Sequence, residues 1–458
     1  MPAAQQIIQD QAGRERTENS REELLWEAES GFFRGWEDRM VRRAQGIRYA
    51  VSERYGPPRA FSCGEGVFSA TSPAPVPAQN DSPIEAFLTG THYARLPQEE
   101  SAQYLSIALP KGASARDRLP VMVWIPGGAF RNGGIDIVPY NTELLAAEQG
   151  VIIVSLQYRL GCLGFLRDRQ GNPANLGLLD LIEGLKWISR NIACFGGDPG
   201  NITLFGHSAG ASAVLHLMIC TGAEGLFRRA IIQSCPFGVM KGRTGLEREM
   251  LRSFMELPAD APLEEILRRQ SVICSARRGK GNAKYMPFAP RYGVPPLPPQ
   301  NELDAAWARA CGRIDVLLGA NQREAALYLG LNKHLCALAG MPLARGVMER
   351  VIQIKSREIF LDGTEEFYER HCGRNSRMHC YRLTWGMGES IFGASHAVEM
   401  SLLFGAGNYA GSPLLLGKTA GEIDGIGRQV RKVWADFAKT GSIGATEING
   451  VLKIRRRG

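Results

Sequence analysis

The chain lacks any long uninterrupted hydrophobic run. Its longest mainly apolar stretches, 150–156 and 211–220, fall well short of the ~20 residues that a membrane-spanning helix requires. The first residues also lack a basic segment followed by an apolar one, so no secretory signal is visible. We therefore expect no membrane span and a cytoplasmic location.

Cysteine is scarce, and charge is not concentrated. Ten cysteines in 458 residues are too few for a disulfide scaffold, and the lack of any C-x-x-C pair argues against a zinc or thioredoxin-like site. The net charge of +8 is mostly spread along the chain. The short basic runs at 268–269, 277–280 and 455–457 have no interleaved aromatic residues that could stack on bases. We expect free thiols, no bound metal and no nucleic-acid partner.

The rest of the composition is that of an ordinary globular protein. Hydrophobic residues account for 44% and charged residues for 22% of the chain, which excludes a disordered, collagen-like or coiled-coil protein. We expect a polar N-terminal extension over residues 1–30, as a frayed or surface helix, followed by one domain over residues 31–445. The irregular segment 236–310, rich in Arg and Pro, would form a lid or cap, and residues 446–458 a basic tail.

Short apolar segments alternate with helical ones from residue 119 onward. Strands are expected at 120–125, 151–158, 202–205, 229–234, 315–319 and 378–383. Helices are expected at 141–149, 178–192 and 211–220. Apolar strands that alternate with helices predict an α/β fold with a central, mostly parallel twisted sheet flanked by helices.

The sequence Gly206-His207-Ser208-Ala209-Gly210 lies between an expected strand and an expected helix. Taken alone, this G-x-S-x-G pattern is also compatible with an ordinary turn between the two elements. In this context it matches a nucleophile elbow, where small flanking residues permit a strained backbone and a close approach of strand and helix. Ser208 is therefore the candidate nucleophile.

A second turn of small residues could complete a site for acyl transfer. The turn 126–130 follows the first expected strand and contains two consecutive glycines, although such a pair alone can simply mark a turn. Acyl transfer needs backbone N–H groups that are already oriented toward the developing oxyanion. The candidate donors are the N–H groups of Gly128, Ala129 and Ala209.

The base and the acid follow from the order of residues along the chain. After a nucleophile elbow the acid comes next and the histidine last. Among seven histidines, His396 lies in a Gly-containing loop after the last expected strand, where a mobile base is expected. Glu324 lies just past the strand at 315–319 and would orient the imidazole. Three other carboxylates fall in or beside an expected helix and are expected to be solvated: Glu358, Asp362 and Glu365.

Taken together, these segments resemble the type B carboxylesterase family, the cholinesterase-like branch of the α/β-hydrolases. The resemblance extends from about residue 31 to 441, in the family's order. It is carried by the segments 46–50, 56–61, 121–130, 158–165, 175–180, 195–199, 206–210, 227–234, 319–324, 396–399 and 434–441.

The resemblance implies an α/β-hydrolase fold with a short lid. The family's triad falls on Ser208, Glu324 and His396, and its oxyanion donors fall on Gly128, Ala129 and Ala209.

Three positions depart from the family's pattern. Ala102 stands where secreted members have a disulfide cysteine, Ala129 where a third glycine is common, and Cys235 where a glycine is usual. No match to an aromatic choline-binding site is visible, so cholinesterase specificity is not implied.

We expect a serine carboxylesterase that hydrolyses a neutral or moderately hydrophobic small-molecule ester through an acyl-enzyme, without a metal or organic cofactor. Two alternatives use the same triad, namely a carbamate hydrolase and a biosynthetic acyltransferase. A third alternative is a cholinesterase-like binding protein without catalysis. The oligomeric state does not follow from the sequence.

Overall fold

The computed structural model describes residues 22–166, 174–275, 281–373, 377–388, 390–444 and 447–456. Thirteen strands of this part form one twisted sheet in the order β1-β2-β3-β9-β11-β10-β12-β13-β14-β15-β17-β16, with β6 paired to β2. The strands are β1 (Glu22–Ala28), β2 (Gly31–Glu37), β3 (Val41–Arg48), β6 (Val67–Ser69), β9 (Tyr104–Pro110), β10 (Leu119–Ile125), β11 (Ile152–Leu156), β12 (Gly197–His207), β13 (Arg229–Gln233), β14 (Asp315–Asn321), β15 (Met378–Leu383), β16 (Glu447–Ile448) and β17 (Leu452–Arg456).

The centre of the sheet is parallel and its edges are antiparallel. Strands β11, β10, β12, β13, β14 and β15 are adjacent and parallel, and they are the six strands that the sequence predicts. Antiparallel pairs extend the sheet on both sides. Two short ribbons lie apart from it, β4 (Ala50–Val51) with β5 (Arg59–Ala60) and β7 (Val76–Pro77) with β8 (Gln98–Glu99). The α/β-hydrolase fold with a parallel central sheet is confirmed.

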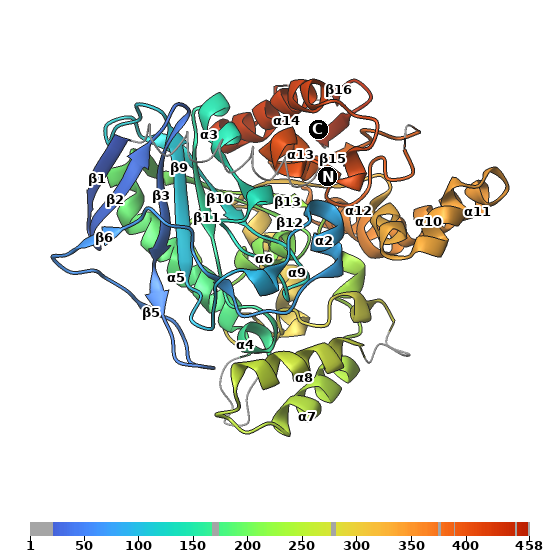
Figure 1. Cartoon of the computed structure of the whole chain (residues 1–458), viewed down its shortest axis with the longest axis horizontal. Coiled ribbons are helices and arrows are strands. Elements are labelled where there is room, and N and C mark those ends of the chain that lie inside the picture. Colours follow the sequence, from blue (N-terminus) through green and yellow to red (C-terminus); the bar gives the residue numbers. More distant parts are fainter. Residues whose placement is uncertain are drawn as a thin grey trace, which may run out of the picture.

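Helices cover both faces of the sheet, and Figure 1 shows α3, α13 and α14 on one side and α5, α6 and α9 on the other. Two further pairs, α7 with α8 and α10 with α11, extend away from the sheet. The helices are α2 (Pro83–Thr89), α3 (Glu143–Gln149), α4 (Gly161–Phe165), α5 (Leu176–Asn191), α6 (Ala209–Leu217), α7 (Thr244–Met255), α8 (Leu263–Ser275), α9 (Leu303–Cys311), α10 (Lys333–Gly340), α11 (Pro342–Ser356), α12 (Asp362–His371), α13 (Val398–Phe404) and α14 (Ala420–Thr440).

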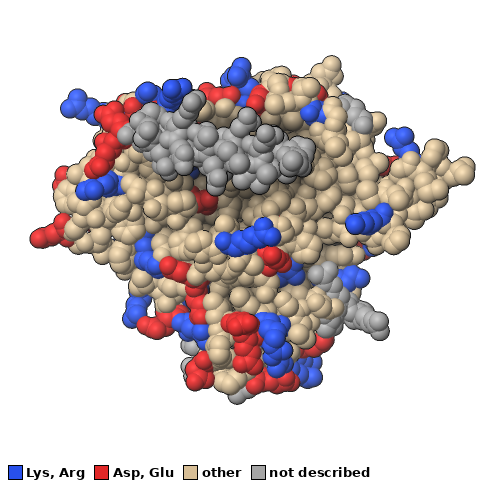
Figure 2. Space-filling view, viewed as in Figure 1, with Lys and Arg blue, Asp and Glu red and all other residues tan. Residues whose placement is uncertain are grey.

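The surface carries mixed charge. On the face drawn in Figure 2, Lys and Arg are interspersed with Asp and Glu over most of the outline. The net charge of +8 is therefore not gathered into a single basic field on this face. All ten cysteines are free thiols.

Side chains of the central strands point alternately into two hydrophobic cores. In β10, Val121, Val123 and Ile125 belong to the core that α5 and α6 cover. Met122 and Trp124 belong to the core that α13 and α14 cover. Because side chains alternate between the faces of a strand, a continuous apolar run is needed when both faces are buried. This requirement explains why the central strands read as unbroken apolar segments.

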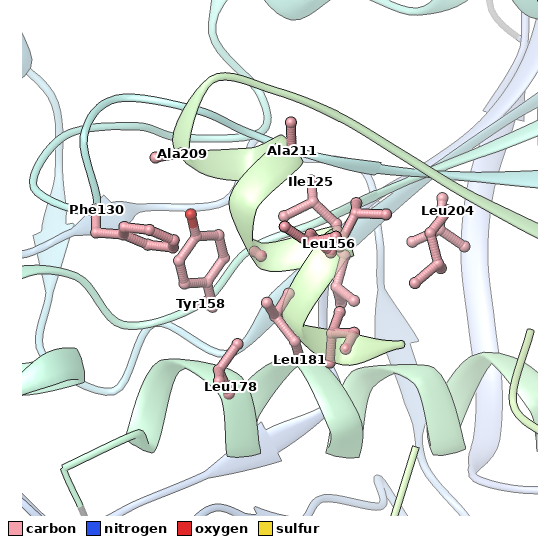
Figure 3. Close-up of a cluster of buried hydrophobic side chains, with 14 of the residues drawn as sticks. Ile125, Phe130, Leu156, Tyr158, Leu178, Leu181, Leu204, Ala209 and Ala211 are labelled. Atoms are coloured by element: carbon pink, nitrogen blue, oxygen red, sulfur yellow. The ribbon is translucent and has the colours of Figure 1, made fainter. Parts of the chain in front are cut away.

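The first turn of α6 rests directly on one of these cores. Ala209 and Ala211 are completely buried, and Figure 3 shows them at the start of the helix, with Ala211 close to Ile125. Leu178 and Leu181 of α5 lie on the other side of the same cluster. The turn that carries Ser208 is therefore attached to a densely packed support.

The two ends of the described chain correct the expected domain boundaries. Residues 22–28 form strand β1, not the surface helix expected over 1–30, and residues 1–21 lie outside the described part. Residues 447–456, expected as a basic tail, form β16 and β17, which close the other edge of the sheet. In β17 apolar and charged side chains alternate, as in Leu452-Lys-Ile454, and one face is buried. In β1 burial alternates, because Leu24, Trp26 and Ala28 are less exposed than the residues between them. The many charged residues in the two segments hid this two-residue alternation, which is typical of a strand.

The expected lid segment 236–310 is largely helical. It contains α7, α8 and α9, and residues 276–280 lie outside the described part. Helix α9 belongs to the body of the protein, because its buried residues Ala310 and Cys311 join the core beneath the sheet. The sequence did not predict a second covering segment, which the α10–α11 pair supplies.

Candidate active site

Ser208 occupies a strained turn between β12 and α6. Its φ of 58° and ψ of −120° lie in a region that residues with a side chain rarely adopt, at a cost of roughly 1–3 kcal/mol. Two hydrogen bonds hold this conformation. The Ser208 N–H donates to the carbonyl of Gln233 at 2.9 Å, and the Ser208 carbonyl accepts from the N–H of Ser212 at 3.0 Å.

The glycines on either side of Ser208 are required by close backbone contacts. A Cβ atom added at Gly206 would lie 2.6 Å from the backbone of Gly210. A Cβ atom added at Gly210 would lie 2.1 Å from the carbonyl oxygen of Ile125 on the neighbouring strand. Neither space can admit a side chain, so the elbow depends on both glycines.

The turn after β10 presents three successive residues with positive φ. The φ angles are 112° at Gly128, 56° at Ala129 and 53° at Phe130. This turn lies against the elbow, since a Cβ added at Gly127 would be 3.4 Å from the Cβ of Ser208. The two segments that carry the candidate oxyanion donors are therefore adjacent.

The three candidate oxyanion donors have no hydrogen-bond partner in the part of the chain that the structure describes. Among the described residues, no group accepts a hydrogen bond from the N–H of Gly128, Ala129 or Ala209. Gly128 and Ala129 line the cavity that Ser208 faces, whereas Ala209 is completely buried at the first position of α6. Unpaired N–H groups beside a nucleophile can donate to a developing oxyanion.

His396 and Glu324 form a buried pair. The Nδ1 atom of His396 lies 2.5 Å from Oε2 of Glu324, and the His396 N–H donates to the Glu324 carbonyl at 3.2 Å. The other carboxylate oxygen of Glu324 accepts from the N–H of Asn321 at 2.7 Å. Glu324 is fully buried, so the carboxylate is held in one orientation and fixes the imidazole with Nε2 free.

Ser208 and His396 face the same cavity. It has a volume of about 650 Å³ and is lined mainly by apolar side chains. The apolar lining comes from α2, α11 and the segment after β14, and includes Leu88, Leu327, Leu329, Met348, Ile352 and Phe360. The structure therefore places the serine and histidine that the sequence singled out at the wall of one apolar cavity, with the buried glutamate in contact with the histidine.

Chain order excludes His207 as the base, yet this residue contacts the candidate base. The rings of His207 and His396 have centroids 4.3 Å apart, and the ring of Phe360 lies 4.8 Å from His396 on another side. The pKa of His207 is lowered well below its ordinary value, first by burial and then by the proximity of His396. His207 is therefore neutral next to the candidate base.

A second buried carboxyl lies close to this histidine. Oε1 of Glu399 is 3.5 Å from Nε2 of His207, and neither atom has a hydrogen-bond partner among the described residues. Oε2 of Glu399 accepts from the side chain of Asn321 at 2.5 Å. Burial, and then the charge of Glu324, raise the pKa of Glu399. In the sequence this residue ends the segment 396–399, which carries part of the family resemblance, but no role was expected for it.

Glu85 is a further carboxyl that the sequence analysis missed. It belongs to α2, is 7% exposed and lines the cavity. Burial raises the pKa of Glu85 to about 7, and the proximity of His396 lowers it only in part. Nothing in the sequence of this short helix, which Ser82 caps, indicated that it would reach the site.

The segments that cover the cavity contribute unequal numbers of residues to its lining. From the expected lid, only Pro236, Val239, Tyr285 and Met286 line it among the residues that the structure describes. The α10–α11 pair and the helical turns next to it, Glu324–Leu331 and Arg357–Leu361, contribute more. The expected lid is therefore the smaller part of the cover.

Neither a cluster of metal-ligating side chains nor a membrane-spanning helix is present in the described ranges. No group of three or more His, Cys, Asp or Glu side chains there is arranged to hold a metal ion. No helix in those ranges is both long and apolar enough to cross a membrane.

Comparisons with known proteins agree with this geometry. Residues 25–335 match the Carboxylesterase family. Over 91% of this chain and 93% of the relative, the chain is 32% identical to the probable N-octanoylanthranilate hydrolase AqdA2 of Rhodococcus erythropolis. It is 30% identical to the para-nitrobenzyl esterase of Bacillus subtilis (strain 168), covering 92% of this chain and 90% of that protein. A solved structure of a thermophilic PNB esterase superposes with a TM-score of 0.76 at 25% identity, covering 94% of this chain and 97% of that one. The chain therefore belongs to the carboxylesterase family and is a carboxylic ester hydrolase with the α/β-hydrolase fold.

Proposed function

We propose that the protein is a serine carboxylesterase that works through an acyl-enzyme. Ser208 is the nucleophile, His396 the general base and acid, and Glu324 the residue that orients the imidazole. The observation that carries this proposal is the buried His396–Glu324 contact of 2.5 Å, at the wall of the cavity that Ser208 also lines. A base oriented in this way is what a serine hydroxyl needs to become nucleophilic at neutral pH.

The reaction proceeds in two halves. In the first, the Ser208 oxygen adds to the ester carbonyl carbon while His396 takes the hydroxyl proton, and His396 then gives that proton to the departing alcohol. In the second, water adds to the acyl-serine, His396 again accepts and returns a proton, and the carboxylic acid leaves. Every proton is carried by His396, so the steps as written need no metal or organic cofactor.

The oxyanion of each tetrahedral intermediate would accept hydrogen bonds from Gly128, Ala129 and Ala209. These N–H groups have no partner within the described chain. They are held in place by the folded backbone before the reaction begins, so little reorganisation is needed when charge appears. A single donor of this type is typically worth about 3–4 kcal/mol of transition-state stabilisation.

The cavity supports a neutral or moderately hydrophobic ester as substrate. Most of its lining is aliphatic or aromatic. Transfer of apolar acyl or alcohol groups from water into such a lining is favourable, by ~25 cal/mol for each Å² of apolar surface removed from water.

A second candidate is hydrolysis of an N-acyl compound by the same residues. The observation that favours it is the 32% identity, over 91% of this chain, to a protein described as a probable N-octanoylanthranilate hydrolase. In that compound, as its name states, the octanoyl group is on nitrogen. His396 would then protonate a departing amine in place of an alcohol. Carbamate hydrolysis and acyl transfer to an alcohol also use this arrangement, and analysis of products with competing alcohols separates transfer from hydrolysis.

The deciding experiment compares the wild type with Ser208→Ala on short p-nitrophenyl esters and with a fluorophosphonate probe. We expect the variant to lose hydrolysis and labelling, while Ser69→Ala, on exposed β6, keeps both. Substantial hydrolysis by Ser208→Ala would contradict the proposed nucleophile. Lack of labelling and hydrolysis in the wild type would favour a binding protein without catalysis.

We also expect a cytoplasmic protein, in keeping with ten free thiols.

A further inference from the structure

The α10–α11 hairpin carries an unusual share of the exposed apolar surface. Figure 1 shows this pair of helices projecting from the body of the molecule at the right of the view, and Figure 2 shows the projection mostly in tan. Of the seventeen large hydrophobic side chains that are exposed in the described part of the chain, eight lie between residues 331 and 354. They are Leu331, Leu335, Leu338, Met341, Leu343, Val347, Val351 and Ile354.

On α11 these side chains form one row. Leu343 is 96% exposed, Val347 67% and Ile354 54%. Residues spaced by three or four positions lie on the same face of a helix, so this row is continuous. Single exposed apolar residues are ordinary, but a contiguous row of this size marks a surface that contacts something else. We call all eight exposed apolar residues between 331 and 354, those before α11 included, the apolar row.

The apolar row reaches the mouth of the active-site cavity. Leu331, Leu335 and Val351 are exposed to solvent and also line the cavity. Whatever covers the row therefore lies next to the entrance through which substrate reaches Ser208.

The charges beside the apolar row are positive on balance. Residues 333–362 contain five cations and three acids, a net charge of 5 − 3 = +2. Each acid has a cationic partner: Glu349 lies 2.7 Å from Arg323, Glu358 2.7 Å from Lys355 and Asp362 2.9 Å from Arg357. Arg345 and Arg350 are exposed and form no ion pair with a described residue. The five cations are Lys333, Arg345, Arg350, Lys355 and Arg357.

The sign of this charge distinguishes between two possible occupants. A second copy of the chain would bring like charges together across the contact, which opposes association. An apolar strip edged by Lys and Arg instead matches a membrane surface that contains anionic lipid, where apolar side chains enter the interface and cations meet the headgroups. Charge complementarity therefore favours a lipid surface.

We propose that the α10–α11 hairpin docks on the surface of a membrane that contains anionic lipid, with the cavity mouth at the bilayer. Apolar esters dissolved in the bilayer would then enter the cavity without crossing water. Docking itself does not depend on the proposed hydrolase function, so Ser208→Ala should bind vesicles as the wild type does.

Flotation of the full chain with vesicles tests this proposal. We expect binding to phosphatidylcholine vesicles that contain phosphatidylglycerol, and weaker binding to phosphatidylcholine alone or at high salt. The double substitution L343Q/V347Q should weaken vesicle binding roughly tenfold or more. R345Q/R350Q should weaken binding to the anionic vesicles roughly tenfold while affecting neutral vesicles little.

The matched control is Leu25→Gln on β1, which lies at the opposite end of the molecule in Figure 1 and is 59% exposed. This variant should bind vesicles like the wild type. Leu343 and Val347 do not line the cavity, so L343Q/V347Q should keep its activity on a short water-soluble ester, which also shows that it is folded.

Two results would overturn the proposal. One is wild-type protein that does not float with anionic vesicles. The other is a pair of observations on L343Q/V347Q. The wild type forms a concentration-dependent dimer in sedimentation velocity that these substitutions abolish, while the substitutions leave vesicle binding unchanged.

Discussion

Nε2 of His207 lies 3.5 Å from Oε1 of Glu399, beside the pair formed by His396 and Glu324. The two histidine rings are 4.3 Å apart, and Asn321 donates one hydrogen bond to each carboxylate, at 2.7 Å to Glu324 and 2.5 Å to Glu399. Two histidine–carboxyl contacts thus share one buried space. Charge on Glu399 acts on the candidate base through this arrangement.

Glu399→Gln should move the acid limb of the pH profile. Burial and the Glu324 charge raise the pKa of Glu399, so this group ionises only as the pH approaches or passes neutrality. Its negative charge then lies close to the His396–Glu324 pair, and a nearby negative charge favours the protonated, inactive form of a base. Removal of this charge should lower the apparent pKa seen in kcat/KM, by up to about one pH unit. An unchanged acid limb would contradict an electrostatic effect of Glu399 on His396.

Glu324→Gln should impair catalysis strongly without unfolding the protein. An amide can keep the shape of the side chain but cannot hold the imidazolium that forms when His396 takes the serine proton. We expect kcat to fall by roughly 10³–10⁴. Glu365→Gln, at a partly exposed position on α12 remote from the cavity lining, is the matched control and should retain wild-type kcat. Equal losses in both variants would point away from Glu324 as the acid.

The two residues of the oxyanion turn should respond differently to substitution. In Gly128→Ala, the added Cβ would lie 2.0 Å from the carbonyl oxygen of Asn132, so the turn must shift and its donors move. We expect kcat to fall by roughly 10²–10³, as for loss of one oxyanion donor. Ala129→Gly keeps the N–H and relaxes a positive φ of 56°, so kcat should stay within a few-fold of the wild type. Steady-state kinetics on one short ester measures both.

Glu85 should make the stability of the fold depend on pH. Burial raises the pKa of Glu85 to about 7, above the ~4.3 expected when the chain is unfolded. Between these values the folded protein holds a proton that the unfolded chain has released. Stability is therefore complete below about pH 4 and decreases as the pH rises through 7, by up to about 4 kcal/mol for this group.

The variant Glu85→Gln removes this contribution. The free energies of unfolding of the variant and the wild type are measured in urea at pH 5 and pH 8. The variant should be the more stable of the two by a larger margin at pH 8 than at pH 5. A difference between the two proteins that stays the same at both pH values would show that Glu85 is ionised in the folded state throughout.

The buried ion pair between Arg159 and Asp180 should be important for stability. Nε and Nη2 of Arg159 lie 2.8 and 2.7 Å from the two carboxylate oxygens, and the side chains are 3% and 0% exposed. Asp180→Asn would leave a buried guanidinium without its counter-charge, at a cost of about 3–5 kcal/mol. The exposed pair of Arg370 and Asp304 is the control, and Asp304→Asn should hardly change the urea midpoint.

The sequence was informative wherever local chemistry is specific. The apolar runs of the six central strands predicted the parallel sheet, because strands buried on both faces tolerate few polar residues. Gly206 and Gly210 predicted the elbow, because only glycine fits where backbones come within about 2–3 Å of the Cβ position. The order of residues along the chain selected Glu324 and His396, and the structure places them in contact.

The sequence did not predict features that depend on which segments lie close together in space. Strand β17 alternates apolar and charged residues, but it joins the sheet through β15, which is remote along the chain. Strand β1 contains three Glu among seven residues, so in both segments charge dominated the interpretation. Glu85 reaches the cavity only because α2 packs against the segment that follows β14.

The sequence by itself determined the central sheet, the strained serine turn and the identity of three candidate catalytic residues, since each is written in local residue patterns. Tertiary structure alone decided which carboxyls are buried near His396 and that α10 and α11 cover the cavity. Burial and electrostatic proximity arise from contacts between segments distant along the chain, and residue patterns within one segment do not encode them.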